Sequence, residues 1–384
     1  MASRKIPPLF DMIAKLIALP SVSSVSAEFD MGNDAVSHLL AGWCESFGCA
    51  TEIMPIQTRP GHSNMLATLG KGAGGLVIAG HTDTVPYNEN LWQHDPFKAT
   101  EADNRLYGLG TTDMKAFLAL ALEAASRVNP RQLKKPLFLL ATAGEESNMS
   151  GAKTLVDKRR PHADFAVIGE PTNMRPVRMH KGIMMENIRI TGRSGHSSNP
   201  AFGNSALEGM HTVISALLDF RRELQENYTH PAFDVPVPTL NLGHIHGGDN
   251  PNRICGACEL SIDLRPLPGM DINELREWLH QRINTRLEAS GLSVDFEPLF
   301  DGIPAVETSA SSPLVLAAEK LTGYTAEAVA FGTEAPYLQA MGMDVIVLGP
   351  GDVACAHQPD EFLQLDRIEP TVKQLEALIH QFCM

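Results

Sequence analysis

Five apolar segments of this sequence each run into a side chain that can bind a metal ion. Short apolar runs of this kind are typical of buried parallel strands. Ligands of open α/β sheets collect just beyond the carboxyl ends of such strands, so we expect these side chains to share one crevice. Two histidines and several carboxylates, with no cysteine, suit zinc or a similar divalent ion, and carboxylate-rich sites often hold two. The side chains are His81 and Asp83 after LVIAG, Asp113 after YGLGTT, Glu145 and Glu146 after LFLLATAG, Glu170 after FAVIG, and His357 after VIVLGPG.

The first two of these signals each have a simpler structural explanation. Residues two apart on a strand point the same way, so we expect Asp83 to orient the His81 ring for a metal. The alternative is a strand-end histidine followed by a turn-forming aspartate. Asp113 follows a Gly-rich bend and could bridge two metals through its two oxygens, or could cap the helix that starts near Met114.

The adjacent acids Glu145 and Glu146 are the sharpest local signal, because buried charges must be compensated. Neighbouring side chains in extended backbone point apart, so one can bind metal while the other moves a proton. The alternative is a solvated helix N-terminus, where acids are favoured. Glu170 could equally be a turn residue before Pro171, and His357 an exposed loop histidine.

The elements that must position these residues fall into two patterns. Strand-like and helix-like stretches alternate up to residue 181 and resume after residue 300, which predicts a mainly parallel sheet with helices on both faces. Between them the order is β-α-β-β-α-β, the ferredoxin-like α+β arrangement. Its second helix opens with Asp271 and Glu274 in capping-box spacing. We therefore expect a discontinuous catalytic domain, 1–181 and 301–384, with an inserted domain, 182–300.

The inserted segment offers three further polar candidates. His196 stands in SGHSSNP and could donate to a developing oxyanion, or could be an ordinary capped loop histidine. Arg265 in LRPLP could bind a substrate carboxylate, or could form a surface ion pair. Asn252 ends the GDNPN turn.

Composition excludes several classes of function. A net charge of −14 over 384 residues argues against nucleic acid and anionic membrane as partners. No apolar stretch is long enough for a signal peptide or a membrane span. Six scattered cysteines do not indicate a disulfide framework, so a reducing cytoplasmic location is expected.

In combination, the motifs resemble those of the dinuclear zinc deacylases, the family that includes acetylornithine deacetylase, succinyl-diaminopimelate desuccinylase, aminoacylase and carboxypeptidase G. The matching motifs occur in order over essentially the whole chain: HTDTVP, YGLGTTDMKAF, the paired glutamates, IGEP, GHSS and AHQPDE. The resemblance implies that His81 and Glu170 hold one Zn²⁺, or Co²⁺, and that Glu146 and His357 hold the other. It further implies that Asp113 bridges the two ions, Asp83 orients His81 and Glu145 is the general base.

The same resemblance carries expectations about partners and substrate. It implies a homodimer formed through the inserted domain, with His196 completing the active site of the partner subunit and with Asn252 and Arg265 contacting substrate. LNLGHIHGGDNPNRIC and DLRPLPGM resemble the acetylornithine deacetylase branch, whose members release acetate and L-ornithine from N2-acetyl-L-ornithine in arginine biosynthesis. Gly144 departs from the Asp expected before the paired acids. The alternatives are a related deacylase, such as a desuccinylase or dipeptidase, and a catalytically silent metal- or ligand-binding relative.

Overall fold

The computed structural model describes residues 6–384 as two compact units. Residues 1–5 lie outside the described range. They begin the N-terminal segment for which no signal peptide was predicted. Within the described residues, unit 1 comprises the chain from residue 6 to Arg178, Thr308–Glu327 and Thr333–Met384, and unit 2 comprises Met179–Glu307 and Ala328–Gly332. The predicted insertion, 182–300, lies inside unit 2. Among the described residues, no helix has the length and apolar character needed to cross a membrane.

The main sheet of unit 1 is parallel at its centre and antiparallel at its flank. β6, β3, β7 and β17 are neighbours in that order and run parallel, whereas β2 pairs antiparallel with β6, and β1 with β2. The prediction of a mainly parallel sheet is therefore confirmed for the central strands. The strands, in sheet order, are β1 (Ala50–Pro55), β2 (Ser63–Leu69), β6 (Leu137–Thr142), β3 (Leu76–His81), β7 (Phe165–Ile168) and β17 (Asp344–Val347).

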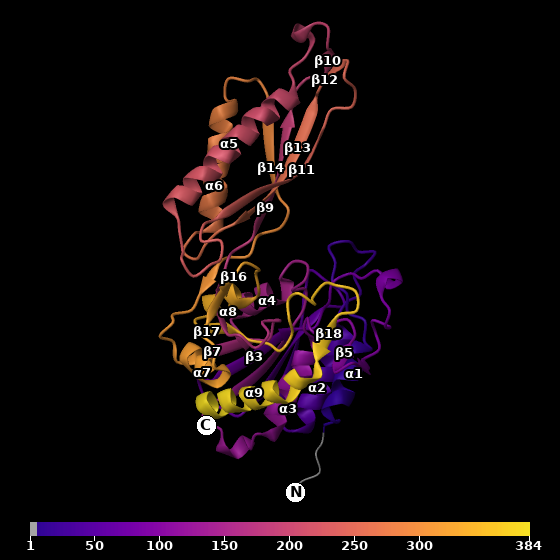
Figure 1. Ribbon diagram of the computed structural model, residues 1–384, viewed down its shortest axis with the longest axis vertical. Helices are drawn as coiled ribbons and strands as arrows, with labels where there is room; N and C mark the ends of the chain where they lie inside the picture. The colour runs from indigo at the N-terminus through magenta and orange to yellow at the C-terminus, as the bar shows by residue number, and fades with distance from the viewer. Residues whose placement is uncertain (1–5) are drawn as a thin grey trace. The chain divides into compact units, whose positions relative to one another are not determined.

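Helices cover both faces of this sheet, as predicted (Figure 1). α3 lies at the centre of one face, where it contacts α1 and α9, and its Ala- and Leu-rich sequence is buried all round from Lys115 to Ala125. α4 and α8 contact each other, and α8 contacts β17. The helices are α1 (Leu9–Ile17), α2 (Asp34–Ser46), α3 (Lys115–Arg127), α4 (Ser150–Lys158), α7 (Pro313–Thr322), α8 (Ala335–Ala340) and α9 (Ile368–Cys383).

Short elements complete unit 1 and connect it to unit 2. A three-stranded sheet, β18-β5-β4, joins chain segments some 250 residues apart. β8 and β16 each carry the chain across the boundary between the units. These elements are β4 (Thr100–Ala102), β5 (Arg105–Tyr107), β8 (Val177–His180), β16 (Glu327–Val329), β18 (Phe362–Gln364) and the 3₁₀ turns Glu89–Leu91, Pro130–Gln132 and Leu365–Arg367.

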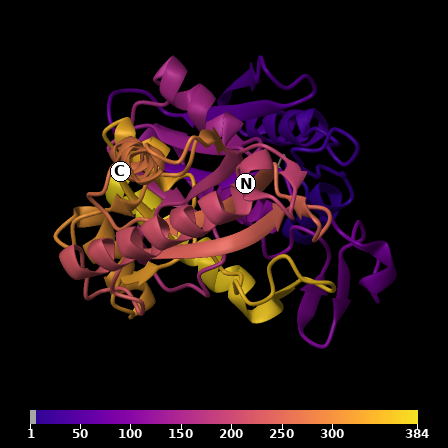
Figure 2. The same cartoon turned by 90° about the horizontal axis from the view of Figure 1, so that it is seen from above.

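Unit 2 has the predicted ferredoxin-like order, with one antiparallel sheet, β11-β13-β9-β14, covered on one face by two helices. Figure 2 shows the long helix α5 running alongside this sheet. The predicted capping at Asp271 is confirmed, because its carboxylate accepts the N–H groups of Asn273 and Glu274. The elements are β9 (Met184–Thr191), β10 (Gly195–His196), a 3₁₀ turn (Pro200–Phe202), α5 (Ala206–Asn227), β11 (Thr239–Gly247), β12 (Arg253–Ile254), β13 (Ala257–Arg265), α6 (Ile272–Leu287), β14 (Ser293–Pro298) and β15 (Val306–Glu307).

Candidate metal centre

Four adjacent strand ends position the candidate residues at one edge of the unit 1 sheet. β3 ends at His81, β6 ends three residues before Glu145, and β7 ends two residues before Glu170. β17, beside β7, leads into the loop that carries His357. Because these strands are parallel neighbours, their carboxyl ends meet at the same edge, as expected for a ligand site of an α/β sheet.

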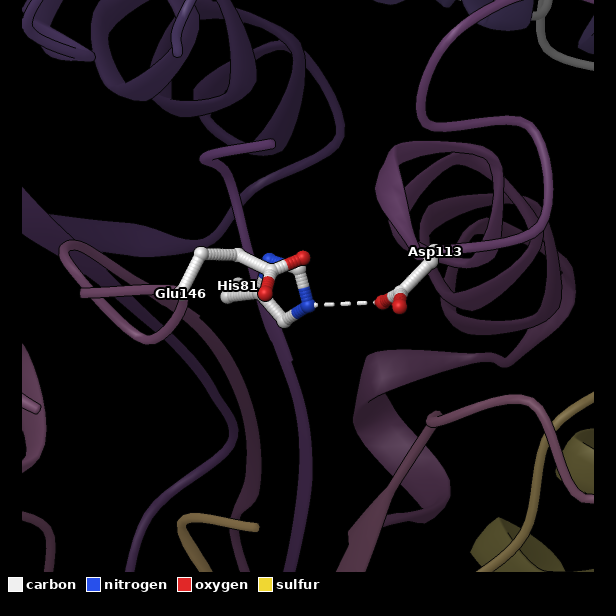
Figure 3. Close-up of side chains that lie close together, drawn as sticks. All are labelled: His81, Asp113 and Glu146. Atoms are coloured by element: carbon white, nitrogen blue, oxygen red, sulfur yellow. Dashed lines mark hydrogen bonds and ion pairs between the residues drawn. The ribbon is translucent and has the colours of Figure 1, made fainter. Parts of the chain in front are cut away.

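Asp113 lies between two histidines and contacts each through a different oxygen. Its Oδ1 is 2.9 Å from His81 Nε2 and its Oδ2 is 3.3 Å from His357 Nε2. His357 Nε2 is also 3.1 Å from Glu146 Oε1, and His81 Nε2 is 3.7 Å from Glu170 Oε1. Figure 3 shows the Asp113 carboxylate pointing at the His81 ring, close to Glu146. The structure therefore brings together five residues that the sequence predicted to be ligands.

The alternative role of Asp113 as a helix cap has no support in the structure. α3 begins at Lys115, its N-cap position is Met114, and no side chain caps it. The Asp113 carboxylate instead makes the two histidine contacts described above.

Asp83 contacts His81 differently from the sequence expectation. The Nδ1–H of His81 donates to the backbone carbonyl of Asp83 at 2.8 Å, whereas the nearest carboxylate oxygen is 3.9 Å away. The carboxylate accepts the backbone N–H groups of Glu145 and Glu146 at 3.3 and 3.1 Å. The reason is that β3 ends at His81, so the same-face rule for a strand does not extend to residue 83.

The carboxylates of the cluster are held in a site that disfavours their ionised form. Burial raises the pKa of Glu145 well above its usual value, and the charge of Glu170 adds to the effect. Burial and the charge of Asp113 do the same to the pKa of Glu170 and, less strongly, of Glu146. The site therefore contains more negative charge than the protein itself neutralises.

In the two histidines, the same surroundings favour the charged form of the ring. Burial lowers the pKa of His81, but the charges of Glu170 and Asp113 outweigh burial and raise it well above its usual value. Hydrogen bonds with Asp113 and Glu146 raise the pKa of His357 to about 10. The surrounding carboxylates therefore favour the protonated form of both rings.

The donor set fits a divalent metal ion. The ligand atoms of His81, Asp113 and Glu146 lie within 4.8 Å of one another, and so do those of His81, Glu145 and Glu170. Glu170 Oε1 is buried without a hydrogen-bond partner, although a buried carboxylate oxygen normally has one. The Nδ1–H bond of His81 leaves its Nε2 as the metal-binding nitrogen of the neutral ring. A cation would satisfy the unpaired oxygen and neutralise the excess charge.

Three predicted residues lie in unit 2. His196 and Asn252 are neighbours, because β10 pairs with β12 and the Ser197 N–H donates to the Asn252 carbonyl at 3.0 Å. The His196 ring is exposed and its Nδ1 accepts the Ser198 hydroxyl at 2.8 Å. Arg265 ends β13, and its Nε donates to Asp263 at 2.9 Å.

Sequence reasoning missed a further buried acid near the centre. Glu334 is 2% exposed, accepts the Thr142 hydroxyl at 2.7 Å through Oε2, and has no partner for Oε1. Burial raises its pKa to about 7. The available signal was an acid in the Gly-Thr-Glu-Ala segment directly before α8, where a helix cap is the usual interpretation.

Comparison with known proteins agrees with this site. The family model for Peptidase family M20/M25/M40 matches residues 77–381. Acetylornithine deacetylase of Aliivibrio salmonicida (strain LFI1238) is 47% identical over 379 residues, 99% of this chain and 100% of that protein. Two solved structures share the fold: aminopeptidase PepT from Bacillus cereus (TM-score 0.76, 20% identity, 97% of both chains) and the YXEP protein of Bacillus subtilis, a dinuclear metal-binding peptidase of the M20 family (TM-score 0.68, 16% identity, 97% of both chains).

The fold and the site together define a metal-dependent hydrolase whose catalytic unit is built on a mainly parallel sheet and contains a candidate metal centre. The chain belongs to Peptidase family M20/M25/M40. The family resemblance predicted from the motifs is confirmed, and the chain is a hydrolase of amide bonds.

Proposed function

We propose that this enzyme hydrolyses N2-acetyl-L-ornithine to L-ornithine and acetate, a step of arginine biosynthesis. The relative that is 47% identical over nearly the full length of both chains is named for this substrate, which supports the proposal. The single structural observation that carries it is Asp113, whose two oxygens face two different histidines in a carboxylate-rich site. Such an arrangement suits hydrolysis of an unactivated amide, because a two-metal site stabilises both the attacking and the leaving atoms.

The proposed ligands divide between two ions, most simply Zn²⁺, with Co²⁺ as a substitute. In this proposal His81 and Glu170 would hold one ion, Glu146 and His357 would hold the other, and Asp113 would contribute a carboxylate oxygen to each. When bound, the ions supply Lewis acidity to the amide carbonyl and make hydroxide available near neutral pH. Asp83 fixes the His81 ring through its backbone carbonyl and holds the loop of Glu145 and Glu146 through its carboxylate.

Glu145 is the proposed general base. It takes a proton from the attacking water and returns it to the leaving nitrogen of ornithine. Its burial and the neighbouring charge of Glu170 raise its pKa, which makes it a stronger proton acceptor than an ordinary carboxylate. An intact acid at this position also argues against a catalytically silent relative.

Unit 2 is the proposed dimerisation domain. Its edge strand β11 pairs with β13 on one side only, and Ile245 on this strand is 51% exposed. Long exposed edges of this kind are normally covered, and a second copy of the same strand would cover it. We also assign His196 to oxyanion stabilisation, and Asn252 and Arg265 to substrate contact. Because the Arg265 Nε already donates to Asp263, a substrate carboxylate has to bind through its Nη groups.

Mixing two inactive variants tests the dimer and the role of His196 together. If His196 acts on the partner's site, a heterodimer of Glu145→Gln and His196→Ala contains one site with both defects and one site with neither. Activity should return after subunit exchange. Proven heterodimers without activity would place His196 within its own subunit or outside catalysis.

A substrate panel on the Zn²⁺-reconstituted enzyme tests the activity itself. Acetylornithine should give the highest kcat/KM, ahead of succinyl-diaminopimelate and of simple dipeptides, and Glu145→Gln is the matched control for contaminating activity. A clear preference for another amide would replace the proposed substrate while leaving the metal centre intact. The cytoplasmic location and the absence of nucleic-acid and membrane partners stay predictions from the sequence.

A further inference from the structure

Glu361 is a buried acid in the AHQPDE segment that the proposed mechanism does not use. It follows His357 by four residues, directly precedes β18 and is 2% exposed. One of its oxygens, Oε1, accepts three backbone N–H groups: those of Gly110 at 3.1 Å, Thr112 at 2.7 Å and Asp113 at 2.9 Å. All three donors belong to the Gly-rich bend that ends in Asp113.

The backbone around Glu361 is bound to the same bend. The Glu361 carbonyl accepts the Gly108 N–H at 3.0 Å, and the Phe362 carbonyl accepts the Thr112 hydroxyl. β18 continues the contact by pairing with β5, with Phe362 opposite Tyr107. The segment that carries His357 is therefore attached to the segment that carries Asp113 through both main chain and side chain.

An acid at this place is electrostatically unfavourable for the folded chain. The site is buried, and the charge of Asp113 lies beside it, so the pKa of Glu361 is raised to about 8. A neutral acceptor would bind the three N–H groups with less cost to stability. The convergence of three donors on one oxygen nevertheless defines where the Asp113 backbone lies, and hence where its carboxylate points.

We propose that Glu361 is a positioning residue that holds Asp113 and His357 at the spacing required for them to share a metal ion. It acts through the bend 110–113 and contacts neither substrate nor metal. The proposal rests on the metal centre put forward under the proposed function. Groups behind metal ligands typically change metal affinity about 10- to 100-fold when removed.

Two conservative variants separate reach from charge. Glu361→Gln keeps an acceptor oxygen at the same side-chain length and removes the ionisable carboxyl group. Glu361→Asp keeps an ionisable carboxyl group but is one methylene shorter, so it cannot reach the three N–H groups from the same backbone. Glu361→Ala removes both. Glu123→Ala is the matched control, because Glu123 is an equally buried acid on α3 of the same unit, paired with Arg127 at 2.9 Å.

The measurement is titration of each apoprotein with Zn²⁺, with the melting temperature followed with and without metal. We expect Glu361→Asp and Glu361→Ala to bind Zn²⁺ about 10- to 100-fold more weakly, and Glu361→Gln to stay close to wild type. Glu123→Ala should lower both melting temperatures equally and leave Zn²⁺ affinity unchanged. At saturating Zn²⁺, the Glu361→Asp variant should have a lower kcat and an unchanged KM, because its substrate contacts are unaltered.

Several results would overturn the proposal. One is wild-type Zn²⁺ affinity in Glu361→Asp. Another is loss of affinity in Glu361→Gln as large as in Glu361→Asp, which would make charge the cause. A third is a change in melting temperature alone, matching the Glu123 control. If the wild-type protein itself fails to bind two ions, the proposed metal centre is wrong. Because the titration needs no substrate, its outcome does not depend on which amide the enzyme hydrolyses.

Discussion

Both units bury acidic side chains, and Glu186 of unit 2 and Glu170 of unit 1 have opposite surroundings. In unit 2, Glu186 on β9 is fully buried and bonded to Arg276 Nε and His280 Nε2, both at 2.9 Å. In unit 1, Glu170 is 6% exposed, and its Oε1 has no hydrogen-bond partner, with His81 Nε2 3.7 Å away. The protein thus neutralises one buried acid completely and leaves the other to be completed by something else.

The difference indicates which buried charges stabilise the fold and which are suited to binding a ligand. An ion pair such as that of Glu186 offsets much of its own desolvation, so it can be explained without function. The unit 1 cluster gathers Asp113, Glu145, Glu146 and Glu170 around two histidines, and its unrelieved repulsion raises several carboxyl pKa values. A bound cation would relieve this repulsion, which is the physical argument for the proposed metal centre.

The largest expected effect is on turnover, within the unit 1 cluster. Glu145→Gln should lower kcat by at least about 10²-fold, because a general base is lost, while bound metal stays at the wild-type level. Steady-state kinetics together with elemental analysis measure both quantities. Near-normal activity at normal metal content would rule out Glu145 as the base.

Metal content should distinguish Asp113 from Glu146. Asp113→Ala should reduce the total bound metal, because both ions lose a ligand, whereas Glu146→Ala should weaken mainly one site. Elemental analysis of the purified variants after dialysis provides the comparison. If Asp113→Ala retained two ions per chain, the bridging role would have to be abandoned.

The acid of unit 2 should behave as a purely structural one. Glu186→Ala leaves Arg276 and His280 without their partner, so we expect a loss of about 3 kcal/mol in the free energy of unfolding, as for other broken buried pairs. Zn²⁺ stoichiometry should not change. Denaturant unfolding tests the predicted loss of stability, and metal analysis tests the unchanged stoichiometry. A loss of metal in Glu186→Ala would contradict the purely structural role of this acid.

The smallest effect concerns His180, a fully buried histidine of unit 2 whose Nε2 has no partner. Burial lowers its pKa to about 4, below its unfolded value near 6.5, so the unfolded chain binds the extra proton. Its contribution to stability is therefore complete above pH 6.5 and is lost as the pH falls toward 4. His180→Phe should flatten this part of the stability curve, measured by chemical unfolding between pH 4 and 7. An unchanged slope would mean that other groups cause the pH dependence.

Much of the arrangement was determined by local sequence patterns. The ends of β3, β6 and β7 were predictable because apolar runs stop where the chain leaves the sheet, and the acids and His81 stand at those stops. The ferredoxin-like order of unit 2 followed from alternating apolar residues and from the cap at Asp271. These features depend on a few neighbouring residues, so the sequence alone contains them.

Long-range contacts decided the rest. Local sequence alone favoured Asp113 as a cap of the helix that follows it, and only the return of the chain to His357 determines which contacts it makes. The same holds for Asp83, whose carboxylate contacts the loop of Glu145 rather than His81, because the strand ends two residues before it. The role of Glu361 was not predicted, because its three backbone N–H donors lie about 250 residues away in the sequence. Contacts between segments so distant are fixed by the packing of the whole sheet, which no local pattern in the chain records.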